Sequence, residues 1–259
     1  MPAVRARKRF GQHFLHDAGV IRRIVAAAAP QPGQAVLEIG PGRGAITRGL
    51  IEAGASLTVV EIDRDLAATL ATEFGQHLNL ITGDVLDLDL AALPQPIRVV
   101  GNLPYNISTP VLFHLFAQID RIDTMLFMLQ KEVADRLAAP HGNKTYGRLT
   151  VTAQLHCDVR SLFNVPPGAF APPPAVMSSV VYLAPRADRP AQPIFDALDT
   201  VLVRAFGKRR KTLSNALADC LDGSDFETLG INPRLRPENL TPDDFLRCAI
   251  RFLEKEGCT

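Results

Sequence analysis

The sequence lacks the features of a membrane, secreted or metal-binding protein. No apolar run reaches the roughly 18 residues that cross a bilayer, and the basic N-terminus is not followed by an apolar segment with a cleavage site. Only four cysteines occur, and none forms a Cys-x-x-Cys pair or has a histidine at metal-ligand spacing. We therefore expect a cytoplasmic protein with reduced thiols, without a membrane partner and without a bound metal.

The sequence also lacks a strong net charge. Its 28 lysine and arginine residues face 27 aspartate and glutamate residues, and 47% of the 259 residues are apolar. This composition excludes a disordered chain and by itself points away from a nucleic-acid partner. The basic residues nevertheless gather in two short runs, although such runs are more often only a solvated surface. The runs are Arg5, Arg7, Lys8 and Arg9 near the start, and Lys208, Arg209, Arg210 and Lys211 late in the chain.

Short apolar runs alternate with helical patterns through the first two thirds of the chain. This alternation predicts an α/β layer fold with a mainly parallel sheet. The expected strands are residues 35–39, 57–61, 78–81, 97–100, 125–129 and 176–183, and the expected helices include residues 45–53, 65–74, 131–138 and 148–156.

The composition changes after a group of prolines that ends at Pro193. Beyond it the apolar residues recur at helical spacing, and Thr241 with Asp244 resembles a capping box that opens the last helix. We therefore predict two domains, residues 1–187 and a small helical domain at residues 188–259.

A glycine-rich turn at residues 38–44 follows the first predicted strand. Alternating glycines are a weak signal, because they can serve packing alone. Glu61 ends the next strand, where an acceptor for a ribose diol belongs, and Asp84 ends the third, where it could bind an adenine amino group. Either carboxylate could also simply cap the following helix. A dinucleotide dehydrogenase is disfavoured, because Ala45 stands where its fingerprint needs a third glycine. The spacing favours S-adenosylmethionine.

The most informative segment is Asn102-Leu103-Pro104-Tyr105, after the fourth predicted strand. The N6 nitrogen of adenine is a poor nucleophile, because its lone pair is conjugated into the ring. The Asn102 amide oxygen and the Leu103 carbonyl, oriented by Pro104, could accept its two N–H groups and stabilise positive charge as a methyl group arrives. Tyr105 offers a face on which the base can stack. The alternative is a turn that uses Asn and Pro for local reasons.

With these motifs, the chain resembles the ribosomal RNA adenine N6-dimethyltransferases, and most of all their bacterial small-subunit type. The resemblance covers nearly the whole chain and rests on residues 8–15, 38–42, 102–105, 170–178 (a Phe-x-Pro-x-Pro-x-Val-x-Ser match), 206–213 and 236–240. It implies a seven-stranded, Rossmann-like class I methyltransferase sheet and a C-terminal all-helical domain. It also implies dimethylation of two adjacent adenosines near the 3′ end of 16S ribosomal RNA in the immature small subunit, coupled to subunit biogenesis.

The resemblance assigns roles to individual residues. It implies S-adenosylmethionine contacts at His13, Leu15, Gly40, Glu61, Asp84 and Asn102. Position 13 is more commonly asparagine in the family, and a neutral histidine could still donate a ring N–H there. By itself Phe170 would be a core aromatic residue, but its proline-rich loop favours a surface position, where it would sandwich the target base with Tyr105. The two basic runs and Arg148 become candidate phosphate contacts.

Other interpretations remain open. A 23S-modifying enzyme of the macrolide-resistance type and a DNA adenine methyltransferase share similar motifs, although the Phe-x-Pro-x-Pro and Arg-Arg-Lys segments favour the small-subunit type. A mainly non-catalytic ribosome-assembly factor is the alternative outside the enzymes. We expect a monomer.

Overall fold

The computed structural model describes residues 12–257, so the candidate RNA contacts Arg5, Arg7, Lys8 and Arg9 lie outside the described residues. The chain divides into two compact units. The first contains the residues up to Ala134 together with Val159–Pro185, and the second contains Asp135–Asp158 together with the residues from Arg186 onward. The segment Asp135–Asp158 therefore groups with the second unit, although the sequence analysis placed it in the first domain.

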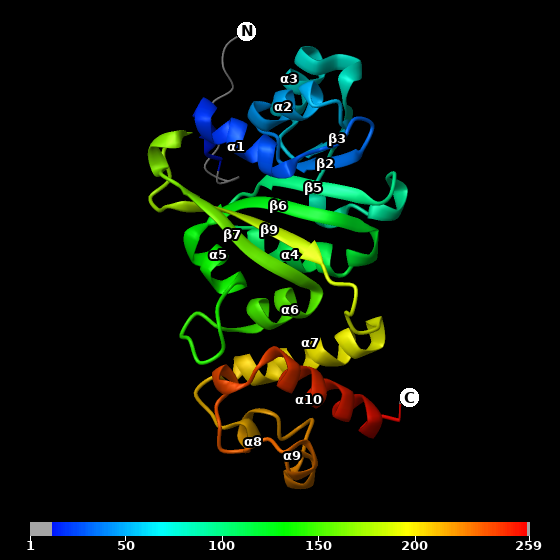
Figure 1. Ribbon diagram of the computed structural model, residues 1–259, viewed down its shortest axis with the longest axis vertical. Coiled ribbons are helices and arrows are strands. Elements are labelled where there is room, and N and C mark those ends of the chain that lie inside the picture. Colours follow the sequence, from blue (N-terminus) through cyan, green and yellow to red (C-terminus); the bar gives the residue numbers. More distant parts are fainter. Residues whose placement is uncertain (1–11, 258–259) are drawn as a thin grey trace. The chain divides into compact units, whose positions relative to one another are not determined.

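The first unit is built on a sheet that, within residues 12–257, has seven strands, as the resemblance implied (Figure 1). The strands follow the order β4-β3-β2-β5-β6-β9-β7, of which the first five are parallel neighbours and β9 is antiparallel to β6. Their bounds are β2 (Ala35–Ile39), β3 (Ser56–Glu61), β4 (Asn79–Thr82), β5 (Ile97–Asn102), β6 (Ile122–Gln130), β7 (Cys157–Val165) and β9 (Ser178–Pro185). The predicted mainly parallel sheet is confirmed.

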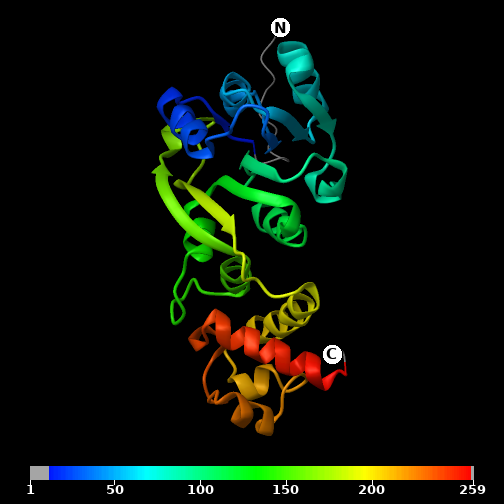
Figure 2. The ribbon, with the colours of Figure 1, turned by 45° about the vertical axis from the view of Figure 1, so that its right-hand side comes forward.

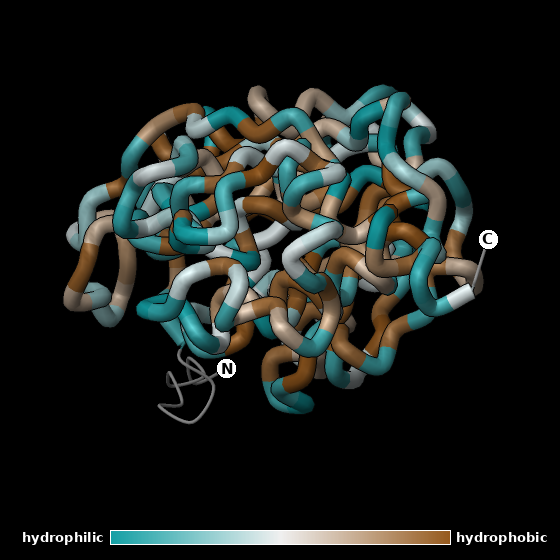
Figure 3. Tube along the Cα trace, turned by 90° about the horizontal axis from the view of Figure 1, so that it is seen from below, coloured by the Kyte–Doolittle hydropathy of each residue, from teal (hydrophilic) through white to brown (hydrophobic). Residues whose placement is uncertain are grey.

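Both faces of the sheet are covered. Successive side chains of its central strands are therefore mostly buried, whichever face they point to. Val36 of β2 packs with Ile24 and Leu50 in one core cluster, while the next residue, Leu37, is equally buried on the opposite face. The helices of this unit are α1 (Ala18–Ala28), α2 (Ala45–Glu52), α3 (Arg64–Phe74), α4 (Ser108–Phe116) and α5 (Lys131–Leu137), of which α5 ends in the second unit. Figure 3 shows the resulting pattern, with short hydrophobic stretches interrupted by hydrophilic ones.

One strand of the large sheet and a short two-stranded sheet were not expected from the sequence. Strand β7 lies at the sheet edge, where most of its side chains are exposed, so it lacks a continuous apolar run. The short strands β1 (Phe14–Leu15) and β8 (Phe170–Ala171) pair in antiparallel fashion, with Leu15 opposite Phe170. A pair of two-residue strands leaves no periodic pattern, yet this one joins segments that are about 155 residues apart.

The second unit is helical apart from the start of β7. Its helices are α6 (Arg148–His156), α7 (Gln192–Gly207), α8 (Leu213–Ala216), α9 (Gly223–Leu229) and α10 (Pro242–Lys255). Helices α7 and α10 lie side by side (Figure 2) and supply most of one apolar core. The predicted capping box is confirmed, because Asp244 N donates to Thr241 Oγ1 and Thr241 N donates to Asp244 Oδ2. The short one-turn helices within residues 12–257 are Gly75–His77, Val85–Asp87, Leu90–Ala92, Ile119–Arg121, Pro167–Ala169 and Pro237–Asn239.

No helix among residues 12–257 combines the length and the apolar character that a membrane crossing needs.

A substitution at Gly44 tests how tightly the turn after β2 is packed. Its φ is +74°, and a Cβ atom there would lie 2.6 Å from the buried Phe74 ring. We expect Gly44→Ala to lower the free energy of unfolding by about 1–3 kcal/mol in a denaturant titration, through backbone strain and overpacking. Gly168→Ala is the control, because a Cβ there meets nothing within 4 Å and φ is not positive. Equal stability of the two variants would contradict this assignment.

Candidate active site

The site lies where four neighbouring parallel strands end. The register pairs Ile39 with Val60 and Gly101, and Glu61 with Thr82, so β2, β3, β4 and β5 finish at one edge of the sheet. A cavity of about 240 Å³ opens there, which is the edge at which such sheets hold ligands. The six predicted cofactor residues all line it, namely His13, Leu15, Gly40, Glu61, Asp84 and Asn102.

The glycine turn forms the floor of this cavity. Gly40, Gly42 and Gly44 have φ values of +64°, +58° and +74°, a left-handed conformation that favours glycine. A Cβ at Gly40 would lie 3.9 Å from the Asn102 carbonyl oxygen, an ordinary van der Waals contact without a clash. Gly44 instead meets the Phe74 ring. Gly44 is therefore needed for packing against Phe74. Gly40 instead lines the cavity, where the absence of a side chain leaves the backbone accessible.

Glu61 is a buried carboxylate held in place by backbone donors. Gly42 N donates to its Oε2 at 3.2 Å and Asp63 N donates to its Oε1 at 2.9 Å. Burial raises the pKa of Glu61 above its ordinary value. The next helix, α3, is capped by Asp63, whose Oδ1 accepts from Asp65 N. Glu61 is therefore not the cap of α3, and its carboxylate faces the cavity.

Asp84 caps a short helix with one carboxylate oxygen and keeps the other unbonded within the described residues. Its Oδ1 accepts from Leu86 N at 2.9 Å and caps the short helix Val85–Asp87. Its Oδ2 has no hydrogen-bond partner in the described part of the chain, and the residue lines the cavity. One carboxylate can therefore cap the helix and still accept a hydrogen bond from a ligand.

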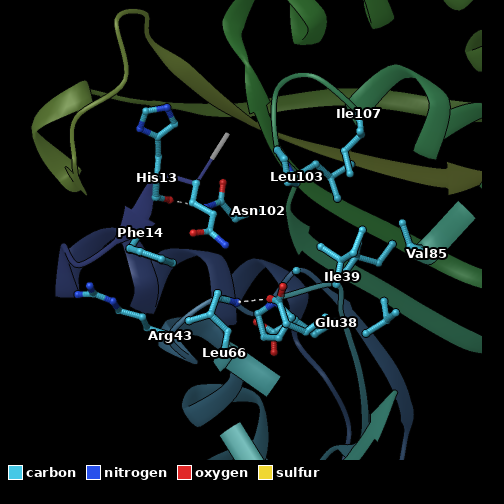
Figure 4. A pocket seen from close by; sticks show the side chains of 18 of the residues that line it. His13, Phe14, Glu38, Ile39, Arg43, Leu66, Val85, Asn102, Leu103 and Ile107 are labelled. Carbon is cyan, nitrogen blue, oxygen red and sulfur yellow. Dashed lines mark hydrogen bonds between the residues drawn. The ribbon is translucent and has the colours of Figure 1, made fainter. Parts of the chain in front are cut away.

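Asn102, the last residue of β5, lines the cavity. Its Nδ2 donates to the His13 carbonyl oxygen at 3.2 Å (Figure 4), which fixes the orientation of the amide. With the N–H side used in this way, Oδ1 is left as an acceptor, and it has no partner among residues 12–257. Leu103 is 1% exposed, and its N–H donates to the Met128 carbonyl at 3.2 Å, so the loop is anchored directly behind Asn102.

Tyr105 is fixed by the 170–178 segment. Its hydroxyl lies 2.7 Å from the Oγ of the buried Ser178. Its carbonyl accepts from Ser108 Oγ at 3.2 Å, and partial burial raises the pKa of the phenol. The His13 ring lies beside it, with ring centroids 5.6 Å apart and planes at 30°. The residues 102–105 thus stand together at the cavity, as the sequence predicted.

The expected surface position of Phe170 is wrong. Phe170 is 3% exposed, because β8 pairs with β1 and turns this side chain into the same core cluster as Leu15 and Val180. It does not line the cavity. Two other residues of the 170–178 segment make contact with the site, Pro172 through His13 and Ser178 through Tyr105. The stacking role of Phe170 stays a prediction.

The candidate RNA contacts of the second unit differ in whether their side chains already form ion pairs or hydrogen bonds with other residues of the protein. Arg148 forms an ion pair with Asp199 at 2.6 Å, and Arg209 Nη2 donates to the Lys144 carbonyl at 2.7 Å. Lys208 lies 3.9 Å from Asp219. Arg210 and Lys211 are exposed and form no ion pair in the described part of the chain. Arg210 and Lys211 are therefore the residues of this run best placed to contact phosphate.

Several residues at the cavity were not singled out from the sequence. Ile62, which follows Glu61, is 44% exposed and lines the cavity. The Arg43 guanidinium lies 4.4 Å from the Phe14 ring centroid. Gln12 Nε2 donates to Asp63 Oδ2 at 3.1 Å. The sequence signal that could have identified Ile62 is an apolar residue directly after the carboxylate that ends a strand.

Glu38 is a further carboxylate beneath the site. It is 1% exposed, and its Oε2 accepts from Thr47 Oγ1 at 2.6 Å. Burial, with a smaller contribution from the nearby charge of Glu61, raises the pKa of Glu38 from 4.5 to about 7.

This pKa predicts a dependence of stability on pH. Between pH 4.5 and 7 the folded protein retains a proton on Glu38 that the unfolded chain releases, so the contribution of Glu38 to stability is largest below pH 4.5 and is lost as the pH rises through about 7. The loss amounts to about 3 kcal/mol. The difference in unfolding free energy between wild type and Glu38→Gln should change by that amount from pH 4.5 to 8. The exposed Glu52→Gln is the control, and a flat difference for both variants would contradict the prediction.

The whole chain matches known ribosomal RNA methyltransferases. It is 51% identical over 260 residues to ribosomal RNA small subunit methyltransferase A of Pseudomonas aeruginosa, covering 98% of this chain and 97% of that protein. The protein of the same name from Methylococcus capsulatus is 50% identical over 244 residues, with 93% and 95% covered.

Solved structures agree. A dimethyladenosine transferase from Plasmodium falciparum has a TM-score of 0.80 at 27% identity and covers 95% of this chain and 98% of its own. The 23S rRNA methyltransferase ErmE has a TM-score of 0.72 at 25% identity, with 92% and 99% covered. The family model described as ribosomal RNA adenine dimethylase matches residues 3–254. The chain therefore belongs to the ribosomal RNA adenine dimethylase family.

Proposed function

We propose that this protein transfers methyl groups from S-adenosylmethionine to the N6 amines of two adjacent adenosines near the 3′ end of 16S ribosomal RNA, in the immature small subunit. The observation that carries the proposal is the fixed amide of Asn102, whose Nδ2 is bound to the His13 carbonyl and whose Oδ1 is left as an acceptor at the cavity. The relatives that are about 50% identical are named as small-subunit enzymes, which favours this RNA.

The cavity fits S-adenosylmethionine, the methyl donor of this family. Glu61 offers a buried carboxylate to ribose hydroxyls, and Asp84 keeps one oxygen for the adenine amine. The exposed Ile62 and the buried Val85 offer apolar contacts to the adenine ring. Gly40 leaves room for the chain of the ligand. Bound in this cavity, the cofactor supplies an electrophilic methyl group on a sulfonium.

The protein's own residues would supply positioning and electrostatic stabilisation. Asn102 Oδ1 and the Leu103 carbonyl accept the N–H groups of the target amine, so that positive charge developing on nitrogen meets two preorganised dipoles. Tyr105 holds the base by stacking, and its hydroxyl bond to Ser178 fixes the ring. Anchored acceptors of this kind need no reorganisation during the reaction.

Modification of 23S RNA is the second candidate, because the ErmE structure is similar over almost its whole length. Its identity to this chain, 25%, is half that of the small-subunit relatives. A role in monitoring subunit assembly is compatible with catalysis. Because the proposed substrate is a ribosomal RNA precursor particle, we expect the protein to act in the cytoplasm. We also expect a monomer.

The proposal is tested by incubating the purified protein with labelled S-adenosylmethionine and immature small subunits, large subunits or DNA, followed by digestion and nucleoside analysis. We expect N6,N6-dimethyladenosine in 16S RNA alone. Within this assay, Asn102→Ala should lower the methylation rate by at least about 100-fold, because one preorganised acceptor is lost, while binding to the subunit persists.

Asn164→Ala is the matched control, since Asn164 is exposed on the edge strand β7 and outside the cavity. Label in large subunits or DNA but not in 16S RNA would refute the proposed substrate. Full activity of Asn102→Ala would refute the proposed role of that residue.

A further inference from the structure

His13 lies where three separate segments of the first unit meet. Its backbone carbonyl accepts from Asn102 Nδ2 at 3.2 Å. Its ring makes a different contact, since Nδ1 lies 2.8 Å from the Pro172 carbonyl oxygen, which can only accept. Nδ1 therefore carries the proton and donates it to Pro172. Figure 4 shows the ring pointing away from the Asn102 side chain.

These contacts are part of a hydrogen-bond network that connects the 102–105 loop, His13 and the 170–178 segment. The 102–105 loop is joined to the 170–178 segment a second time by the 2.7 Å contact between the Tyr105 hydroxyl and Ser178. The antiparallel pairing of β1 with β8, in which Phe14 lies opposite Ala171, connects the same two segments through the backbone. The 170–178 segment is thus held at Pro172 by His13 and at Ser178 by Tyr105.

We propose that His13 is a positioning residue: its ring holds Pro172, and with it the 170–178 segment, against the residues that bind the target adenine. This inference rests on the proposed function and refines it, because it replaces the expected direct contact of the His13 ring with the cofactor. In the neutral ring the Nδ1 proton is already donated to Pro172, and Nε2 can only accept. The ring also lies beside the Tyr105 ring, with centroids 5.6 Å apart.

The chemistry of the side chain suggests a discriminating set of variants. Asparagine places an N–H donor the same number of bonds from the backbone as histidine Nδ1, so His13→Asn can keep the bond to Pro172. His13→Gln places its donor one bond farther out, near the position of Nε2, and His13→Ala has none. Rescue by asparagine but not by glutamine would therefore identify the Pro172 contact as the one that matters.

The experiment measures three quantities on wild type and these variants. Calorimetry gives the dissociation constant of S-adenosylmethionine, and initial rates on immature small subunits give kcat and the KM of each substrate. Amide hydrogen exchange in the cofactor-free protein reports the order of residues 170–178. His16→Ala is the control, because His16 is exposed on the same segment and uses only its backbone N–H toward Ala169.

For His13→Ala and His13→Gln we expect faster exchange in residues 170–178, an unchanged dissociation constant of S-adenosylmethionine, and kcat/KM for subunits lower by about 10- to 100-fold. His13→Asn should restore both exchange and rate. A weaker S-adenosylmethionine affinity with unchanged exchange would overturn the inference in favour of direct cofactor binding, and unchanged values in all variants would overturn it altogether. If wild type fails to methylate 16S RNA, the proposed function fails, whereas the exchange result still decides whether His13 orders the segment.

Discussion

The hydrogen bond from Asn102 Nδ2 to the His13 carbonyl is the contact on which the site depends. It uses the donor side of the amide, so the acceptor side has a defined direction at the cavity. The bond requires the parallel strands to end in register, because β5 must deliver Asn102 beside the turn after β2. It also requires the pairing of β1 with β8, which holds the N-terminal segment over the end of the sheet.

Electrostatics at this edge of the sheet favour a cationic ligand. Glu38 and Glu61 are both buried, and desolvation raises the pKa of each, so their charged forms are costly in the ligand-free protein. A ligand that brings a sulfonium and an amine stabilises those charged forms by Coulomb attraction in a low-dielectric site. Backbone N–H groups of Gly42 and Asp63 hold the Glu61 carboxylate, which lets it face the cavity without moving.

Much of this arrangement could be predicted from the sequence. The apolar strands and the residues at their ends, such as Glu61 and Asn102, leave local patterns that predict a sheet edge with a nucleoside site. Phe170 taken by itself predicts a buried aromatic residue, but its proline-rich loop favoured the surface, and the strand pair between distant segments that buries it leaves no local pattern. The bond from His13 to Pro172 was missed for the same reason, and the edge strand β7 was missed because most of its side chains face solvent. Short-range periodicity carries no information on such tertiary pairings.

We infer that the residues 102–105, His13 and the 170–178 segment act as one hydrogen-bonded unit. A double-mutant cycle on the N6-methylation rate tests it most directly, with His13→Ala, Ser178→Ala and the double variant. Because the two side chains hold opposite ends of the same segment, we predict that the second substitution adds little to the first, with a coupling energy of about 1 kcal/mol or more. Losses in activation free energy that simply add would contradict the account.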